Sequence, residues 1–190
     1  MTRLSHVLIA TALVLTPMRA NLAAQAAKPA ASKAAAAGAG PVLVVETVKG
    51  SIEIQLFSAE APKTVEHIVA LAKKNFYNGH RVHRVEPGYV VQFGDPQSRD
   101  VSKRDKWGSG GSFNPVGVSE SSPKHKHVLG AVSLAHPGDA KLGDSQMFIM
   151  LRTEPKLDGK FTVFGQVISG MDVVRKLQVL DVIRRVTVKS

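Results

Sequence analysis

Apolar and polar positions alternate in short runs after residue 41, and this pattern predicts a protein built mainly from β-strands. Strict alternation is typical of half-buried strands, and short continuous apolar runs between turn residues are typical of fully buried ones. The runs 42–47 and 51–56 flank Val48-Lys49-Gly50 and predict a hairpin. Eight strands are predicted in all, at residues 42–47, 51–56, 82–86, 89–95, 128–135, 146–151, 161–167 and 182–188.

Two other segments have the spacing of helices. The first begins at Ala61-Pro62, because proline suits the first turn, and it carries Lys73-Lys74 in its last turn, where cations favour the helix dipole. The second is expected to begin with Ser169 as its cap and to bury Val173, Val174 and Leu177. Because no βαβ alternation is visible, the pattern predicts a mainly β fold: a closed eight-stranded antiparallel barrel capped by two α-helices.

Residues 95–126 show neither the alternation of a strand nor the spacing of a helix. They are rich in Gly, Ser, Pro, Lys and Asp, with Gly108-Ser109-Gly110-Gly111 near the centre. A loop of this length inside a domain is uncommon and tends to be functional or mobile. We expect Trp107, Phe113 and Val116 to attach it to the body of the domain.

The first forty residues differ from the rest. A short basic start precedes an apolar run that ends before Pro17, and small residues follow, which is the pattern of a secretory signal peptide over residues 1–26. The run is shorter than the roughly 20 residues that span a bilayer, so no stable membrane insertion is expected after cleavage; an uncleaved interfacial helix is the alternative. Residues 27–41 are predicted to be an Ala/Lys/Pro-rich linker and residues 42–190 the folded domain.

Composition excludes several classes of function. The chain has 190 residues, which suffice for one domain with a real core, and 44% of them are apolar. It has no cysteine, which excludes disulfides, cysteine–zinc sites and thiol nucleophiles. The net charge of +10 is spread along the chain rather than gathered in a run, so no nucleic-acid site is predicted.

The stretch 82–95 brings unlike side chains together on two short strands. Val82, Arg84 and Glu86 are expected on one face of the first strand and His83 on the other. Pro87-Gly88 supplies the turn, since proline fixes φ and glycine allows positive φ. A cation, an amide and several apolar groups therefore lie within a few residues of one another. Taken alone, the stretch is an amphipathic hairpin.

Other chemistries have weaker support. His125 and His127 alternate on an extended segment and would face one side, with His80, His83 or His136 as further metal ligands. No acidic cluster accompanies them, and we predict neither a metal nor a cofactor.

A hydrolase dyad from Ser133 or Ser145 and a histidine lacks the Gly-x-Ser-x-Gly elbow. The glycine-rich run 108–111 follows no predicted strand and opens no predicted helix, which argues against a phosphate-binding loop.

Several motifs, in order and at compatible spacings, resemble those of the cyclophilins, a barrel family of peptidyl-prolyl cis/trans isomerases. The resemblance extends from about Val44 to Val188. It rests on the segments 47–52, 61–66, 75–79, 130–135, 145–149, 157–160 and 163–165, and above all on His83-Arg84-Val85-Glu86-Pro87-Gly88-Tyr89-Val90-Val91-Gln92-Phe93-Gly94-Asp95.

This resemblance implies a chemistry and a set of site residues. Rotation about an X–Pro amide has a barrier of roughly 18–20 kcal/mol, and an enzyme lowers it with a donor aimed at the prolyl nitrogen above an apolar slot. The resemblance implies that the catalytic residues are Arg84, Gln92 and His83. It implies that the substrate-binding residues are Tyr89, Val90, Ala135, His136, Gln146, Phe148, Leu157 and Phe161.

The sequence also departs from the family pattern. Lys156 stands where many members carry tryptophan, which bears on cyclosporin binding, and residues 95–126 align poorly. Further departures are Tyr89, Val90, Phe93, His136-Pro137 and Phe161.

The leading hypothesis is an exported, periplasmic or extracellular monomeric isomerase acting on proline-containing polypeptides and unfolded exported proteins. The alternatives are a non-catalytic module that holds chains in the groove or on the 95–126 loop, and a cyclophilin-shaped binder of polyanions or metals.

Overall fold

The computed structural model describes residues 40–189 of the chain. The predicted signal peptide, and the predicted linker except for Gly40 and Pro41, lie outside the described residues. Those two residues join the sheet, since the Gly40 amide donates to the Leu56 carbonyl at 3.0 Å and the Leu56 amide donates to the Pro41 carbonyl at 3.1 Å. No described helix has the length and apolar character needed to cross a membrane.

Eight antiparallel strands form one sheet, as predicted. Their order across the sheet is β3-β4-β6-β5-β7-β2-β1-β8. Most lie within a few residues of the predicted runs, and the hairpin around residues 48–49 is confirmed. The strands are β1 (Val42–Thr47), β2 (Gly50–Leu56), β3 (Arg84–Glu86), β4 (Val90–Phe93), β5 (Ala131–Leu134), β6 (Met147–Met150), β7 (Val163–Ser169) and β8 (Ile183–Lys189).

The sheet is an open, curled half-barrel rather than the closed barrel predicted. The edge strands β3 and β8 do not pair along their length. The segments beside them meet at a single bridge between Arg81 and Val182, flanked by a 2.8 Å hydrogen bond from the Ile183 amide to the His80 carbonyl. The segment that meets the start of β8 is residues 79–82, which precede β3, so β3 itself has no partner on that side. Val82 precedes β3 and is buried in the core, so it does not share the face of Arg84 as predicted.

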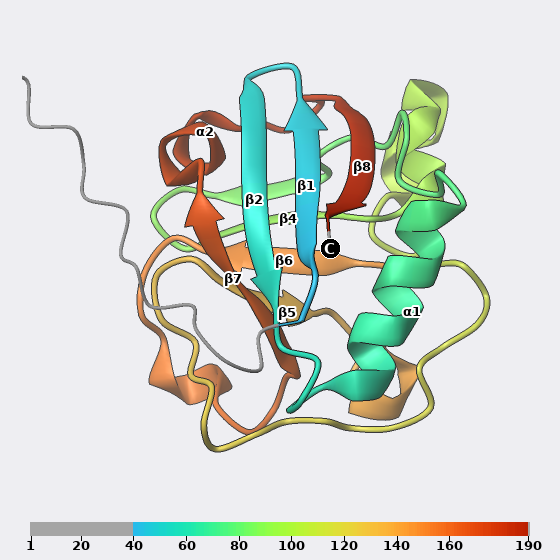
Figure 1. Cartoon of the computed structure of the whole chain (residues 1–190). Coiled ribbons are helices and arrows are strands. Elements are labelled where there is room, and N and C mark those ends of the chain that lie inside the picture. The colour runs from blue at the N-terminus through green and yellow to red at the C-terminus, as the bar shows by residue number, and fades with distance from the viewer. Residues whose placement is uncertain (1–39, 190) are drawn as a thin grey trace, which may run out of the picture. The chain divides into compact units, whose positions relative to one another are not determined.

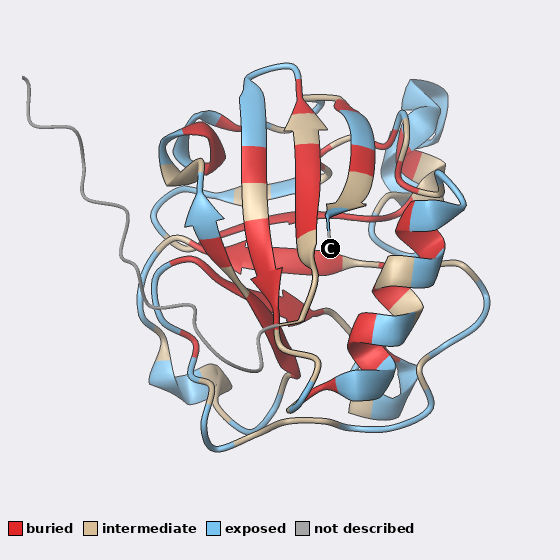
Figure 2. Ribbon diagram, in the orientation of Figure 1, coloured by how far each residue is buried: buried red, intermediate tan, exposed pale blue. Residues whose placement is uncertain are grey.

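Curling places the main apolar core between two parts of the same sheet. In Figure 1, β1 and β2 run in front of β4 and β6, which cross behind them at a steep angle. Residues facing inward from both parts are fully buried, and Figure 2 shows this buried interior along the strands. They include Leu43, Val45, Ile52, Ile54, Val91, Phe93, Val132, Met147 and Ile149.

A second apolar cluster lies on the opposite face of β4, β5 and β6. Because alternate residues of a strand point to opposite faces, the neighbours of the core residues project outward. Val90, Phe148 and Met150 are such neighbours, and they are nonetheless buried, packed with Tyr89, Leu157 and Phe161 among others. These strands are therefore apolar on both faces, and the outward cluster forms the floor of the site described below.

Two α-helices are present among the described residues. Helix α1 (Pro62–Lys73) buries Val65, Ile68 and Ala72, as its spacing predicted, and Leu71 in addition. Helix α2 (Met171–Lys176) is short, and its N-cap is Gly170 with φ 87° rather than the predicted Ser169, which ends β7. The left-handed backbone of Gly170 turns the chain sharply from β7 into α2. Glycine adopts this conformation more readily than serine does.

The segment 95–126 is less irregular than predicted. It contains two 3₁₀-helices, η1 (Pro96–Arg99) and η2 (Val101–Lys106). Two further 3₁₀-helices, η3 (Ala140–Leu142) and η4 (Pro155–Leu157), lie in later loops. Val116 packs against the core as expected, but Phe113 is 93% exposed, so the prediction that it packs on the body is wrong.

The predicted strands 128–135 and 161–167 both begin too early. Val128 and Leu129 are each 41% exposed, and a turn at Gly130, with φ 79°, precedes β5. The early apolar residues of 161–167 belong to the outward cluster, where Phe161 packs before β7 starts at Val163. In neither case does the apolar character of these residues reflect strand pairing.

The N-terminus of α1 is capped from a distant part of the chain. Ala61, at the N-cap position, offers no side-chain acceptor. Instead the Glu120 carboxylate accepts the backbone N–H groups of Lys63 at 2.9 Å and Thr64 at 2.8 Å. A carboxylate at this end satisfies two unpaired donors and opposes the helix dipole. Segment 95–126 is thus fastened to α1.

Replacing Glu120 by alanine is expected to lower the free energy of unfolding by about 1–2 kcal/mol, the usual cost of losing a cap. Urea denaturation followed by circular dichroism measures the change. The matched control is Glu66→Ala, because Glu66 makes only an exposed pair with Lys63 on the same helix. We expect the control to cost less than about 1 kcal/mol, and equal losses would contradict the capping role.

His80 is a buried, uncharged histidine. Its ring makes edge contacts with Phe76 and Tyr77, and neither ring nitrogen has a hydrogen-bond partner among the described residues. Burial, with smaller contributions from Arg99 and His83, lowers the pKa of His80 from 6.5 to about 3. The unfolded chain therefore binds one more proton than the folded chain between these values, and stability falls as pH falls through this window.

Between pH 6 and pH 4, the wild type is expected to lose up to about 1.4 kcal/mol of unfolding free energy per pH unit through His80. His80→Gln should have a shallower slope over the same range, since glutamine does not titrate. Chemical denaturation at a series of pH values measures both slopes. Parallel curves for the two proteins would contradict this account.

Candidate active site

A cavity of about 240 Å³ opens on the outward face of the sheet. Its walls come from β3, β4 and β6, from the residues that follow β5, and from the turn between η4 and β7. All nine lining residues are among the eleven predicted from the sequence: Arg84, Tyr89, Val90, Gln92, Ala135, His136, Phe148, Leu157 and Phe161. The other two predicted residues, His83 and Gln146, do not line it.

Strand register brings the central residues of this cavity into one row. Pairing of β3 with β4 places Arg84 opposite Gln92, and pairing of β4 with β6 places Gln92 opposite Phe148. Gly88, with φ 70°, closes the tight turn that sets the first pairing. Directly paired residues share a face of the sheet, so a cation, an amide and an aromatic ring lie side by side on the outward face.

Arg84 is held by two partners at the rim of the cavity. Its Nη1 donates to Oε1 of Gln92 at 3.0 Å, and its Nε donates to Oε1 of Glu86 at 2.9 Å. The Nη2 group of Arg84 also donates to Glu86. Since a guanidinium has five N–H donors, two remain for a ligand. The side chains of Arg84 and Glu86 are about half exposed, at 46% and 48%, so the fork is oriented and still accessible.

Aromatic rings form the apolar floor. Phe148 is only 5% exposed, and the Phe161 ring meets it edge-on at 5.3 Å between ring centroids. Behind Phe148 lies the nearly parallel ring of His127, at 6.1 Å. Tyr89 forms another wall and carries the guanidinium of Arg152 over its ring at 4.8 Å. The slot is thus apolar inside and cationic at its edges.

His127 and Asp158 support this floor, and the sequence reasoning missed that role. The Asp158 carboxylate accepts the His127 backbone N–H at 2.9 Å and contacts its Nδ1 at 2.9 Å. The hydrogen bond from the His127 backbone is the main cause of the lowered pKa of Asp158. His127 is buried. The pair therefore fixes a ring against the back of Phe148, and only the three-dimensional contact reveals it.

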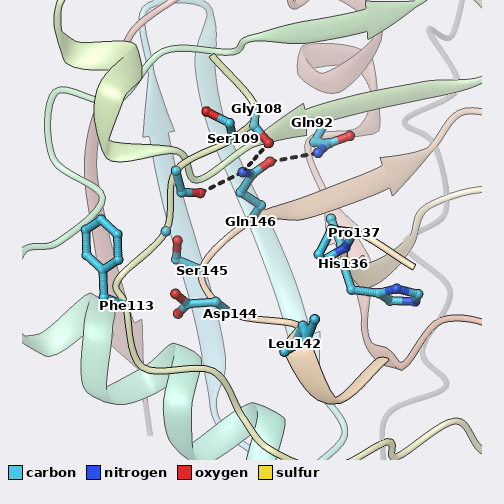
Figure 3. A pocket seen from close by; sticks show the side chains of 13 residues that line it. Gln92, Gly108, Ser109, Phe113, His136, Pro137, Leu142, Asp144, Ser145 and Gln146 are labelled. Atoms are coloured by element: carbon cyan, nitrogen blue, oxygen red, sulfur yellow. Dashed lines mark hydrogen bonds between the residues drawn. The ribbon is translucent and has the colours of Figure 1, made fainter. Parts of the chain in front are cut away.

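Gln146 belongs to a chain of amides rather than to the cavity wall. Nε2 of Gln92 donates to Oε1 of Gln146 at 2.9 Å, and Nε2 of Gln146 donates to the carbonyls of Gly108 at 2.9 Å and Gly110 at 2.7 Å. Figure 3 shows these bonds as dashed lines. Each glutamine accepts at one end and donates at the other, so the orientation of Arg84 is linked to segment 95–126.

Asp95 fixes the segment that ends this chain. The Asp95 side chain is buried, and its carboxylate accepts the amides of Gln97 at 2.8 Å, Gly108 at 2.6 Å and Gly110 at 3.0 Å. A Cβ on Gly110 would come within 2.4 Å of its Oδ1, so a side chain there is excluded. Asp95 closes the signature stretch in the sequence, and its function is to organise the glycine-rich run 108–111.

His83 lies behind the site, not in it. Both of its ring nitrogens are buried without a hydrogen-bond partner among the described residues, and its ring packs near Gly108. Burial is the main cause of its lowered pKa, so the ring is uncharged at neutral pH. Its direct participation in chemistry stays a prediction, whereas its observed contact is with the glycine-rich run.

The histidines proposed as metal ligands do not converge. His125 stacks on Phe57 at 3.8 Å between ring centroids and lies 3.5 Å from Glu60, while His127 is bound to Asp158. His136 contacts the Lys160 carbonyl at 3.0 Å. Within residues 40–189, no group of three or more histidine, cysteine, aspartate or glutamate side chains is arranged to hold a metal.

The described residues form a curled antiparallel sheet with an oriented arginine above an aromatic slot. Comparison with known protein families identifies the class of protein to which this fold and site belong. Residues 42–190 match the family model described as "Cyclophilin type peptidyl-prolyl cis-trans isomerase/CLD". The chain belongs to the cyclophilin-type peptidyl-prolyl cis-trans isomerase family.

Relatives from two bacteria match over most of their own length. The chain is 37% identical to a peptidyl-prolyl cis-trans isomerase of Helicobacter pylori over 148 residues, covering 77% of this chain and 85% of the relative. It is also 37% identical to peptidyl-prolyl cis-trans isomerase B of Bacillus subtilis over 139 residues, covering 73% of this chain and 91% of the relative.

A solved structure shares the fold. The cyclophilin-type isomerase of Cryptosporidium parvum matches with a TM-score of 0.70 at 23% identity, over 79% of this chain and 98% of that chain. The same protein was also solved in the presence of the dipeptide Ala-Pro.

Proposed function

We propose that this chain is an exported peptidyl-prolyl cis/trans isomerase that acts on proline-containing segments of unfolded exported proteins. Family membership and the cavity support the isomerase activity. The basic and apolar pattern of residues 1–26 supports export to the periplasm or outside the cell. The substrates are expected to be polypeptides, and the enzyme is expected to work as a monomer without a cofactor.

The observation that carries the proposal is the orientation of Arg84 above the aromatic slot. In a twisted X–Pro amide the prolyl nitrogen loses its resonance and becomes a hydrogen-bond acceptor. A donor placed there binds the transition state more tightly than the planar ground state, which is what accelerates rotation. Arg84 has two unused N–H groups at the rim, and Phe148 and Phe161 offer an apolar surface for the prolyl ring.

The roles of the remaining residues follow from their contacts. Gln92 holds Nη1 of Arg84 through its oxygen, which orients the fork. Glu86 holds the opposite side of the same guanidinium. Ala135 and His136 line the cavity beside the end of β5, where a substrate backbone is expected to lie. No step needs a bond between the protein and the substrate.

Arg84→Ala is expected to lower kcat/KM for a short X-Pro peptide by about 100-fold or more, because the single donor to the transition state is lost. Arg84→Lys should recover little, since an ammonium cannot bind Gln92 and Glu86 as a planar fork does. Line-shape or exchange NMR of the peptide measures the rate without a coupling protease.

Arg185→Ala is the matched control, because Arg185 lies on β8 and pairs with Glu46. We expect it to keep the rate within about twofold of the wild type, as exposed pairs contribute little. Absence of any rate in the wild type would refute the isomerase and favour the chain-holding alternative, and a fully active Arg84→Ala would refute the role of Arg84 as the donor.

Glu86→Ala tests whether orientation of the guanidinium matters. Loss of the carboxylate leaves only Gln92 to position Arg84, and we expect kcat to fall about 3- to 10-fold with little change in KM. Glu86→Gln keeps an oxygen acceptor and should restore most of kcat. If both variants lose the same activity, it is the charge of Glu86, not its hydrogen bonds, that matters to catalysis, and if neither loses activity, Glu86 does not orient Arg84 for catalysis.

A further inference from the structure

A second cavity, of about 540 Å³, adjoins the proposed proline site. The two cavities share Gln92, Ala135 and His136 as walls. A polypeptide with its proline in the first cavity therefore passes the mouth of the second. Since an extended chain covers about 3.3–3.6 Å per residue, the side chain that enters it belongs to a residue within about three positions of the proline.

Two exposed apolar side chains flank this second cavity. Phe113 is 93% exposed and has φ 63°, a left-handed conformation that is rare for a bulky residue. Leu142 is 52% exposed and lies on the η3 side. Figure 3 shows Asp144 between them. Large apolar groups held uncovered at the rim of a cavity offer contact area to a ligand.

Asp144 places a negative charge in the wall between these groups. Its Oδ1 contacts Nε2 of His67 on α1 at 3.0 Å and accepts the Ser112 hydroxyl. Burial acts to raise the pKa of Asp144, but the hydrogen bonds from His67 and Ser112 outweigh it and hold the pKa below its ordinary value. Oδ2 lies beside Gly111, where a Cβ would come within 2.5 Å of it, so glycine leaves this oxygen uncovered on that side.

We propose that the second cavity selects a lysine or arginine side chain near the substrate proline, with the aliphatic stem between Phe113 and Leu142 and the cation at Asp144. This inference rests on the isomerase function proposed above. Lysine and arginine combine an apolar stem with a charged end, which matches the order of groups from rim to wall. An apolar side chain would cover Oδ2 of Asp144 without offering it a hydrogen bond, and an acidic one would be repelled.

Other charges near the cavity do not replace Asp144. Asp139 and Lys141 are exposed on η3, where Asp139 accepts the backbone N–H of Lys141 at 2.9 Å, and neither lines the cavity. His136 is turned to the Lys160 carbonyl. Among the residues that line the second cavity, Asp144 is the carboxylate.

The test uses sets of neutral, blocked peptides with one proline, in which Lys, Gln or Glu occupies each of the three positions before and after it. Exchange NMR gives kcat/KM for every peptide with the wild type. We expect one position at which Lys exceeds Glu about tenfold, with Gln between them, because attraction and repulsion at a partly buried carboxylate each contribute up to about fivefold.

Asp144→Asn keeps the size and the acceptor oxygen of the side chain and removes its charge. The Lys-to-Glu ratio should fall to about twofold or less in this variant, while the matched control Asp139→Asn keeps the ratio of the wild type. Because each ratio is taken within one protein, partial loss of folding does not affect it. Phe113→Ala should lower kcat/KM for the Lys and Gln peptides alike, because both lose the same contact with the rim.

The outcomes separate the two proposals. If no peptide is isomerised by the wild type, the proposed function fails. If all peptides are isomerised and no position distinguishes Lys from Glu, or if Asp144→Asn leaves the ratio unchanged, the proposed function survives and the cation-selective cavity is overturned.

Discussion

The site depends on one directional chain of hydrogen bonds, from Arg84 through Gln92 and Gln146 to the carbonyls of the glycine-rich run. A guanidinium on a short edge strand has many accessible rotamers, and each well-oriented acceptor removes some of them. The amide chain has a single sense, because Gln92 must accept from Arg84 and can then only donate onward. A glutamine turned the other way would place two donors together at one end and two acceptors at the other.

This chain exists because the central strands are apolar on both faces. Inward residues such as Val91 and Ile149 fill the main core, while Val90 and Phe148 belong to the outward cluster. Gln92 is a polar residue in the middle of that outward row, and it is only 9% exposed. A buried amide is costly unless its groups are paired, so Arg84 and Gln146 satisfy it and are themselves oriented by it. The hydrogen bonds that satisfy the buried amide of Gln92 thus also position the guanidinium of Arg84.

Sequence patterns predicted those elements whose formation depends on residues close together in the chain. The hairpin of β1 and β2 and the start of α1 follow from periodicity and turn residues, and nine of the residues implied by the resemblance line one cavity. Contacts between distant segments were not predictable in this way. Glu120 caps a helix that begins 58 residues earlier in the chain, and His127 stacks on Phe148, which lies 21 residues later. Neither of these two contacts leaves a periodic pattern in the sequence.

Two of the wrong predictions have a common physical origin. Phe113 and the segment 128–129 were expected to be buried because they are apolar, yet exposure of an apolar residue is common and becomes informative only with its location. The exposure of Val128 and Leu129 follows from the turn at Gly130, whereas the exposure of Phe113 coincides with a cavity and a left-handed backbone. Of these residues, only Phe113 has a strained backbone conformation, which the surrounding structure must hold in place.

Segment 95–126 is therefore part of the domain's frame and also part of the wall of the second cavity. One end is held by Asp95, the middle contributes the carbonyls that orient Gln146 and the ring of Phe113, and the far end caps α1 through Glu120. Asp144 links the same segment to α1 by contacting both Ser112 and His67. A ligand side chain that binds between Phe113 and Asp144 would contact the segment that ends the hydrogen-bond chain from Arg84. Residues well removed from the first cavity are thus in a position to affect both the proposed choice of substrate and the orientation of Arg84, the proposed donor.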